Sequence, residues 1–249
     1  MDLAHQLRLH AHQAEWTRPM RRELYRRVRL ASCASVLDVG CGDGGITEEM
    51  AGICRGRVVG ADRDAQALTA ARARKGRAEF AEADACSLPF GRASFDLVTC
   101  HWLLLWLSDP VRALKEFRRV LTPEGAVLIA CEPDYGGRMV EPAEAGLRDE
   151  LIAALKGQDA DPLLGRKLAG LLTDAGFSAR ELGLYPGVWD SRLRVERLRE
   201  EEHWLRAVLG GSVAADRLDA AMRSLKKAHR RGGLMMVTPV FWALAGKKG

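Results

Sequence analysis

The stretch SVLDVGCGDGGITEEM, residues 35–50, decides how this chain folds. Its apolar start is typical of a short buried strand, and the glycines behind it are typical of a turn that leads into a helix. From Gly40 onward the glycines follow the G-x-G-x-x-G spacing of a dinucleotide-binding turn. Together with Asp38, two residues earlier, they also fit D-x-G-x-G-x-G. The two interpretations imply different ligands, and the rest of the chain has to decide between them.

Strand-like and helix-like segments alternate around this turn. Apolar or β-branched runs predict strands at 36–39, 57–61, 80–85, 94–100 and 126–132. Amphipathic or alanine-rich segments predict helices at 3–30, 45–54, 64–75 and 109–121. Such alternation indicates an α/β, Rossmann-like fold, in which right-handed crossovers place helices on both faces of a mostly parallel sheet. A ligand then binds beyond the carboxyl ends of the strands.

The pattern changes after residue 135. Helical patterns cover 141–157 and 161–177, and strand-like patterns cover 178–189 and 233–246. We expect the two late strands to complete a seven-stranded sheet with an antiparallel edge strand. We also expect residues 31–249 to form the main domain, with helical insertions at about 136–160 and 191–231. The second insertion is expected to fold back over the strand ends as part of a helical lid.

Composition restricts the function classes. The 249 residues are 47% hydrophobic and 29% charged, as in ordinary globular proteins. No apolar run is long enough to span a membrane, and the first residues lack the apolar core of a signal peptide, so we expect a cytoplasmic protein. The net charge of +5 includes basic clusters at 18–29, 72–77 and 226–231, which would suit a nucleic-acid partner. Because few aromatic residues lie among these dispersed charges, solvated helix faces are the simpler interpretation.

Cysteine spacing does not predict a metal site. The six cysteines have wide, irregular gaps and form no C-x-x-C, which argues against a zinc cage or a disulfide framework. Four of them fall near predicted strand ends: Cys41, Cys86, Cys100 and Cys131. A thiol cluster for a soft ion is one interpretation of that placement, and small buried core residues are the other. We expect no metal.

Three carboxylates decide what the glycine turn holds. Asp62, at the end of the second predicted strand, can accept hydrogen bonds from ribose hydroxyls under either interpretation. Asp38 discriminates more, because a carboxylate just before the turn suits a ligand with a cationic end better than a pyrophosphate. Asp84, which ends the third predicted strand, can accept a hydrogen bond from an adenine amino group. Together the three carboxylates favour an adenosyl ligand that carries a positive charge.

These features resemble the class I S-adenosylmethionine-dependent methyltransferases over roughly residues 14–185 and the final strand. The segment VLDVGCGDG resembles the first motif of that family, and GADRD, DACSLPF, FDLVTCHWLLLWLSDP and VLTPEGAVLIACEPD resemble its later motifs in order and spacing. The nearest group is that of the ubiquinone-biosynthesis-like and small-molecule methyltransferases. The resemblance implies an enzyme that uses S-adenosyl-L-methionine, releases S-adenosyl-L-homocysteine and methylates oxygen, nitrogen or carbon of a small molecule.

The same resemblance implies roles for individual residues at the strand ends. The implied cofactor contacts are Asp38, Gly40, Cys41 and Gly42 around the methionine part, Asp62 on the ribose hydroxyls, Arg63 against the adenine face, Asp84 and Ala85 at the adenine edge, Cys100 and His101 beside the sulfonium, and Arg18 near the carboxylate. Residues 1–30 would then close over the cofactor.

The reaction needs a base only if the acceptor must lose a proton. His101 is the candidate base because its charge state changes near neutral pH. Trp102, Glu132 and Tyr135 are candidates for lining the substrate. An RNA or protein methyltransferase is the main alternative function. A nicotinamide-dependent (NAD) oxidoreductase and a non-catalytic cofactor-binding protein are weaker ones, because the carboxylates disfavour the first and the filled motif positions disfavour the second.

Overall fold

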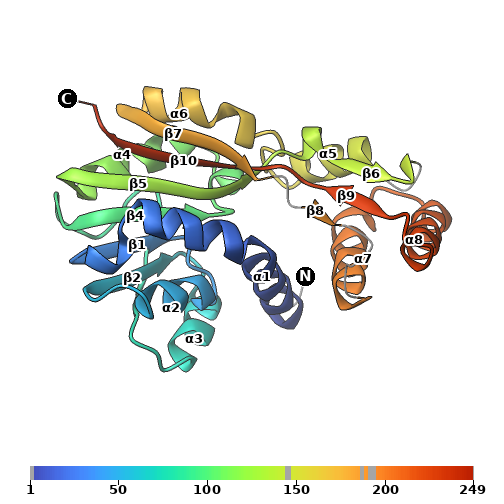
Figure 1. Ribbon diagram of the computed structural model, residues 1–249, viewed down its shortest axis with the longest axis horizontal. Coiled ribbons are helices and arrows are strands. Elements are labelled where there is room, and N and C mark those ends of the chain that lie inside the picture. Colours follow the sequence, from blue (N-terminus) through green and yellow to red (C-terminus); the bar gives the residue numbers. More distant parts are fainter. Residues whose placement is uncertain (1–2, 144–146, 186–187, 190–194, 249) are drawn as a thin grey trace.

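Seven strands form the central sheet of the computed structural model, which describes residues 3–143, 147–185, 188–189 and 195–248. The strand order across the sheet is β3-β2-β1-β4-β5-β10-β7. The strands are β1 (Ser35–Val39), β2 (Arg57–Asp62), β3 (Glu79–Glu82), β4 (Phe95–His101), β5 (Leu121–Pro133), β7 (Phe177–Tyr185) and β10 (Val240–Lys247). The predicted seven-stranded, mostly parallel α/β sheet is therefore confirmed (Figure 1).

Helices cover both faces of this sheet, and β1 shows how the sequence arranges them. Val36 joins a core with α1 (Leu3–Arg27) and α2 (Gly45–Ala51). Leu37 and Val39 join a second core with α4 (Pro110–Val120) and α6 (Leu168–Asp174). The side chains divide in this way because successive residues of a strand point to opposite faces. Asp38 consequently lies on the same face as Val36, toward α1 and α2.

Two helix starts follow the sequence signals. Asp64 caps α3 (Ala65–Ala73) by accepting hydrogen bonds from the Gln66 and Ala67 amides, at 2.8 and 3.2 Å. Asp109 caps α4 in the same manner, and Pro110 occupies its first turn, where no backbone N–H is needed. Both predicted helix entries are confirmed. The cap of α3 matters for the site, because it fixes the chain directly after β2.

The position of the antiparallel strand differs from the prediction. That strand is β10, which pairs with β5 on one side and β7 on the other, so it lies one place in from the edge. Strand β7 forms the edge and runs in the direction of β5, because α6 carries the chain back across the sheet before β7 begins. The chain then re-enters the sheet from the end where β5 and β7 finish, and β10 pairs with both of these strands.

Both late strand segments divide in two. The segment 178–189 continues from β7 into β8 (Val188–Trp189), and the segment 233–246 begins with β9 (Met235–Val237) before β10. Strand β9 pairs antiparallel with β8 and with β6 (Met139–Glu141), and these three strands form a second, small sheet. The sequence did not predict this sheet, because each of its strands is only two or three residues long.

The predicted helix 141–157 is wrong at its start. Glu141 belongs to β6, and helix α5 begins only at Arg148 (Arg148–Lys156). The residue before a proline is driven toward extended backbone, so Pro142 favours a strand at Glu141 rather than a helix. The predicted helix 161–177 is also shorter, because a 3-10 turn at Gly165–Lys167 precedes α6.

Helices α7 (Val195–Leu209) and α8 (Ala215–Arg230) occupy most of the segment 191–231, of which residues 191–194 lie outside the described part of the chain. Their apolar sides belong to the same core as α4 and α6. In Figure 1 the small sheet lies with α5, α7 and α8 to the right of the main sheet, where β5 ends and β10 begins. Among the described residues, no helix has the length and apolar character needed to cross a membrane.

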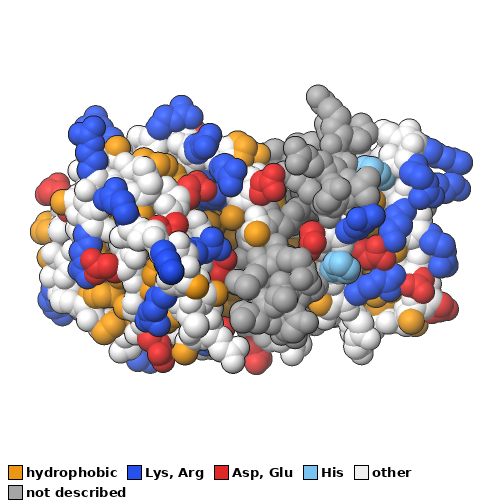
Figure 2. Space-filling model, turned by 90° about the horizontal axis from the view of Figure 1, so that it is seen from below, with side chains coloured by type: hydrophobic (Ala, Val, Ile, Leu, Met, Phe, Trp, Pro, Cys, Tyr) orange, Lys and Arg blue, Asp and Glu red, His pale blue; other side chains and the backbone are white. Residues whose placement is uncertain are grey.

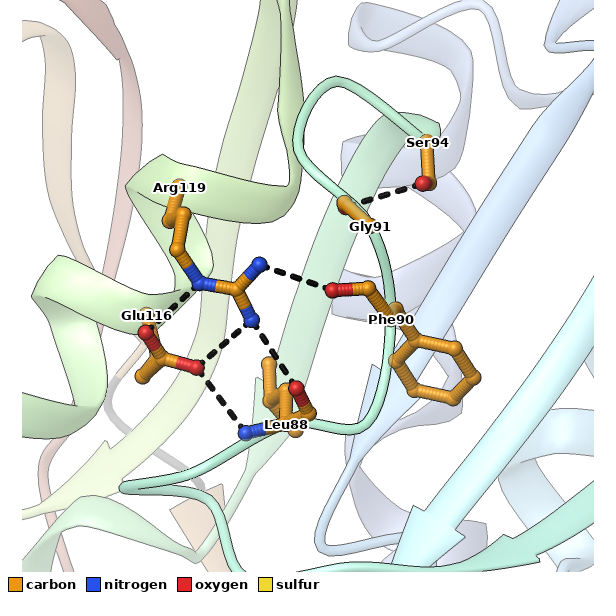
Figure 3. Close-up of polar contacts among 6 residues, drawn as sticks. All are labelled: Leu88, Phe90, Gly91, Ser94, Glu116 and Arg119. Carbon is orange, nitrogen blue, oxygen red and sulfur yellow. Dashed lines mark hydrogen bonds and ion pairs between the residues drawn. The ribbon is translucent and has the colours of Figure 1, made fainter.

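The loop between β3 and β4, residues 83–94, is held by an ion pair on α4 (Figure 3). Arg119 donates hydrogen bonds to the carbonyls of Phe90 and Leu88, at 2.7 and 2.9 Å. It also contacts the Glu116 carboxylate at 2.7 Å, and Glu116 accepts a hydrogen bond from the Leu88 amide at 2.9 Å. Side chains of one helix therefore satisfy three backbone groups of the loop and fix the segment that follows Asp84.

Replacing Arg119 with methionine tests this anchor. The methionine side chain would keep the apolar stem and lose the donors, so we expect Arg119→Met to lower the free energy of unfolding in urea by about 1–2 kcal/mol. The lower end of the range for charged hydrogen bonds applies because the pair is partly exposed. The matched control is Lys115→Met on the exposed side of α4, which should change stability by less than about 0.5 kcal/mol. Equal losses in the two variants would contradict the anchoring role.

Candidate functional site

A cavity of about 530 Å³ lies at the carboxyl ends of β1, β2 and β4. We divide its lining residues into two groups. The strand-tip side comes from β1, the glycine turn with the start of α2, the end of β2 and the end of α3, and the cap side comes from α1, α5, α7, the end of β4 and the loops after β4 and β5. Nine residues predicted from the sequence line this cavity: Asp38, Gly40, Cys41, Gly42, Asp62, Arg63, His101, Trp102 and Tyr135.

The glycine turn is shaped by left-handed backbone and pinned to the end of β2. Gly40 and Gly42 have φ angles of +74° and +53°, which a residue with a side chain adopts only under strain. The Gly40 amide donates to the carbonyl of Ala61 at 2.8 Å, and the Gly42 amide donates to the carboxylate of Asp62 at 2.7 Å. The turn therefore keeps its backbone close to the cavity and cannot shift relative to β2 without breaking both bonds.

Asp62 is held in place while part of its carboxylate stays available. One oxygen accepts the bond from Gly42, and the other accepts a bond from the Asp64 amide at 2.9 Å. A carboxylate has about four acceptor positions, so roughly two remain for a ligand. Because Asp62 lines the cavity, those positions suit a pair of neighbouring hydroxyl groups.

Asp38 places a second carboxylate in the cavity wall. It is only 2% exposed, and one of its oxygens accepts a hydrogen bond from the Thr47 hydroxyl on α2 at 2.6 Å. The other oxygen lies 3.9 Å from Nδ1 of His101. A buried carboxylate with little compensating positive charge favours a ligand whose nearby end is cationic.

His101 contributes an imidazole with unused hydrogen-bonding capacity. It ends β4, is 8% exposed, and neither of its ring nitrogens has a hydrogen-bond partner within the described residues. Burial lowers the pKa of His101, and the nearby Asp38 carboxylate opposes this effect only in part. The ring is therefore neutral at neutral pH, and its unprotonated nitrogen is an acceptor without a partner among the described residues.

Asp84 and Ala85 line a smaller cavity of about 60 Å³ beside the large one. The two cavities share five lining residues: Gly40, Asp62, Arg63, Leu103 and Trp106. The Asp84 carboxylate accepts a hydrogen bond from the Cys86 amide at 2.8 Å, which fixes its orientation. The structure thus brings the three predicted carboxylates onto one continuous surface along the strand ends.

The cap side includes residues that the sequence did not single out. The ring of Trp204 on α7 stacks on Tyr135, with centroids 5.6 Å apart and planes 22° apart, and both rings line the cavity. Leu155 and Gln158, at the end of α5, line it as well. No motif identifies these positions, because the amphipathic pattern of a helix predicts a buried face but not the element that covers it.

Three predicted site residues do not line either cavity: Arg18, Cys100 and Glu132. Cys100 is fully buried in the core of the sheet. The Arg18 side chain is 51% exposed and lies 3.7 Å from Glu49. Arg21, which no motif in the sequence marks, is a buried arginine of α1 and donates hydrogen bonds to Thr17 and Glu49, both at 2.5 Å.

Glu132 holds the loop after β4 instead of contacting the cavity. It is fully buried and accepts hydrogen bonds from the amides of Leu103, Leu104 and Leu105, at 3.1, 2.9 and 3.3 Å. These bonds support Trp102, whose φ of +54° costs a bulky residue about 1–2 kcal/mol. Glu132 therefore positions the part of the loop that forms the cap side.

Basic side chains do not gather into one band on the described part of the face that Figure 2 shows. Figure 2 shows lysine and arginine interleaved with acidic side chains over both the left part of the molecule and the right part. Several basic side chains of α7 and α8 are paired, for example Arg206 with Glu202 and Lys226 with Glu202, at 3.0 and 2.6 Å. In the part of the chain that the structure describes, no group of three or more potential metal ligands is present.

Comparison with known proteins gives a consistent result. A family model described as a methyltransferase domain matches residues 37–129. An uncharacterized methyltransferase of Schizosaccharomyces pombe is 30% identical over 232 residues, which cover 85% of this chain and 81% of that protein. A trans-aconitate 2-methyltransferase of Methylobacterium radiotolerans is 34% identical over 168 residues, 66% of this chain and 61% of that protein.

A solved structure adds a similarity of fold. The phosphoethanolamine N-methyltransferase 2 of Haemonchus contortus, in complex with phosphomonomethylethanolamine and S-adenosylhomocysteine, superimposes with a TM-score of 0.57 at 19% identity. The match covers 86% of this chain and 49% of that one.

The role of Glu132 predicts a pH effect on stability. Burial raises the pKa of Glu132 to about 7, although the three amide donors act in the opposite direction. The folded state therefore binds a proton more tightly than the unfolded chain, and this contribution to stability is lost as pH rises from about 4.5 to about 7.

The variant Glu132→Gln removes this titration and leaves one loop amide facing an N–H group, so we expect a loss of about 1–3 kcal/mol. We expect the stability difference between wild type and Glu132→Gln, measured by urea unfolding, to change between pH 4.5 and 7. A difference that stays constant over this interval would contradict the assignment.

Proposed function

Because the chain belongs to the class I S-adenosylmethionine-dependent methyltransferases, we propose that it transfers a methyl group from S-adenosylmethionine to a small-molecule acceptor. The observation that carries this proposal is the meeting of the Asp38 and Asp62 carboxylates with the glycine turn in one cavity that an aromatic cap side closes. Such a cavity offers a polar binding surface for a cofactor and a separate surface for an acceptor.

The residues of the strand-tip side fit this cofactor. In our proposal the two available acceptor positions of Asp62 take the ribose hydroxyls, and Asp38 with the glycine turn surrounds the cationic methionine end. Arg63 lies against the adenine, and Asp84 with Ala85 reads its edge from the smaller cavity. Arg18 is left out of this set because its exposed side chain lines neither cavity.

The chemistry divides between the cofactor and the chain. S-adenosylmethionine, when bound, supplies a methyl group that is activated by a positively charged sulfur. The chain has to orient the acceptor in line with that group and exclude water. His101, neutral and without hydrogen-bond partners among the described residues, can accept the proton of a hydroxyl acceptor. The Asp38 carboxylate, 3.9 Å away, then stabilises the protonated imidazole.

The size and closure of the cavity support a small acceptor. Cofactor and acceptor share about 530 Å³, which lies within the range of pockets that hold a single drug-sized ligand. Trp204 of α7 lines the cavity, so we propose that the segment 191–231 acts as a lid and that α1, which contributes Gln13 and Ala14, closes the other side. A cavity of this volume suits a small molecule better than an RNA or protein acceptor.

The cysteines support a reducing compartment, and we propose the cytoplasm. All six are free thiols, and Cys41, Cys54, Cys100 and Cys131 are buried. Structural disulfides are characteristic of oxidising compartments, and this chain uses none of its cysteines in that way.

The first prediction from the proposed function concerns Asp62. The variant Asp62→Asn keeps the size of the side chain and removes its charge, so we expect S-adenosylhomocysteine to bind about 10–100 times more weakly by calorimetry. The matched control is Glu82→Gln, an exposed carboxylate at the tip of the neighbouring strand β3, which should leave the affinity unchanged. Unaltered affinity in Asp62→Asn, with the fold retained, would reject the proposed ribose contact.

The second prediction concerns the charge of His101. Because burial lowers its pKa, we expect the His101 ring to titrate below pH 6.5 when followed by NMR in the wild-type protein. The folded state favours the neutral ring more than the unfolded chain does. This contribution to the free energy of unfolding is therefore present above pH 6.5 and is lost as the pH falls below that value. Asp38→Asn should move the midpoint lower still, since the Asp38 charge favours the protonated ring. A wild-type midpoint above pH 6.5 would argue against His101 as the base.

A further inference from the structure

Formal charges in the large cavity are confined to the strand-tip side. Among the described lining residues, the charged ones come from β1, the glycine turn, the end of β2 and the end of α3: Asp38, Asp43, Asp62, Arg63 and Arg74. Arg74 is paired with the Asp43 carboxylate. The described residues of the cap side include no Asp, Glu, Lys or Arg, and their polar side-chain groups belong to Gln, His, Tyr and Trp.

This distribution limits the charge of the acceptor. An ionised group that enters the cap side loses its water and meets no opposite charge there. Moving such a group out of water without a partner costs several kcal/mol. A carboxylate or phosphate acceptor would need a cation on the cap side, and the described lining residues provide none.

The cap side is instead rich in flat aromatic rings. Trp102, Trp106, Trp204 and Tyr135 line it, so three of the six tryptophans of the chain gather at this surface. In a chain with only 6% aromatic residues, this concentration indicates a surface for an apolar ring. Ring–ring contacts with an aromatic ligand add to the binding that burial of its apolar area supplies.

Two contacts three residues apart hold the rings in position. Tyr135 stacks on Trp204, and Arg138 donates a hydrogen bond to Glu201 at 2.6 Å. The Arg138 and Glu201 side chains are only 3% and 9% exposed, and Arg138 also donates to Thr238 at 2.8 Å. This double contact between the segment after β5 and helix α7 preforms the aromatic surface. The charge of Arg138 is also neutralised by Glu201 within the protein.

We propose that the acceptor is a small, uncharged aromatic compound with a hydroxyl group, such as a phenol, whose ring packs against Tyr135 and Trp204. The inference rests on the proposed function and specifies its substrate class. In the reaction the phenolic oxygen forms a bond to the methyl carbon while the bond from carbon to sulfur breaks, and its electron pair stays on sulfur. The phenolic proton passes to His101 and from there to solvent.

An ammonium compound is the competing acceptor class, because aromatic rings attract cations. The described residues of the cap side offer an ammonium group no carboxylate, and an amine must lose its proton before it can attack. The aromatic rings therefore fit a neutral ring better than a cation.

Three probes with the same ring and different charges test the proposal. We would titrate 2-naphthol, 2-naphthoate and 2-naphthylmethylammonium into the wild-type protein saturated with S-adenosylhomocysteine and measure binding by calorimetry. We expect 2-naphthol to bind at least about ten times more tightly than either ion, a difference of about 1.4 kcal/mol. Equal or tighter binding of the carboxylate or the ammonium probe would overturn the proposed class.

Variants of Trp204 separate a direct contact from a structural role. Trp204→Ala should weaken 2-naphthol binding about ten-fold and leave the affinity for S-adenosylhomocysteine unchanged, whereas Trp204→Phe should restore most of the loss. The control is Trp242→Leu on β10, where the ring contacts Arg27 away from the cavity lining. An unchanged 2-naphthol affinity in Trp204→Ala would contradict the inference. Absence of S-adenosylhomocysteine binding to the wild type would instead overturn the proposed function itself, and the acceptor class with it.

Discussion

The hydrogen bond from the Gly42 amide to the Asp62 carboxylate is the contact on which the site depends. It pins the left-handed glycine turn to the end of β2, and it orients the carboxylate that lines both cavities. The second Asp62 oxygen binds the Asp64 amide, and Asp64 caps α3. Strand end, turn and helix start therefore form one unit, and a ligand that binds the turn meets a carboxylate whose orientation is already set.

Local patterns and parallel topology explain what could be predicted from the sequence. A glycine turn after a buried strand and carboxylates at successive strand ends must meet at one edge of a parallel sheet, as Asp38, Asp62 and Asp84 do. Contacts between distant elements could not be predicted. A glutamate can contact a bound ligand or hold a loop through hydrogen bonds. Only the distances from Glu132 to three loop amides show that it has the second role. Trp204 lines the cavity because α7 packs beside it, and the local sequence of α7 does not show which element the helix packs against.

The cavity separates two physical demands. Carboxylates and glycine backbone form the strand-tip side, where we propose that fixed acceptors replace the lost water contacts of a polar, partly cationic cofactor. Neutral side chains and stacked rings make up the described residues of the cap side, where we propose that an acceptor is oriented by shape rather than by charge. His101 lines this cavity at the end of β4, beside Asp38 of β1, and in our proposal it is a neutral base that adds no charge to the cap side.

Thermal unfolding of the wild-type protein with different cofactors tests the central claim most directly. A ligand present at about one hundred times its dissociation constant stabilises the folded state by about 2.7 kcal/mol, which raises the melting temperature by several degrees. The carboxylate arrangement predicts such a rise with S-adenosylmethionine and with S-adenosylhomocysteine, and none with NAD at the same concentration. A rise with NAD, and none with either adenosyl compound, would contradict the account.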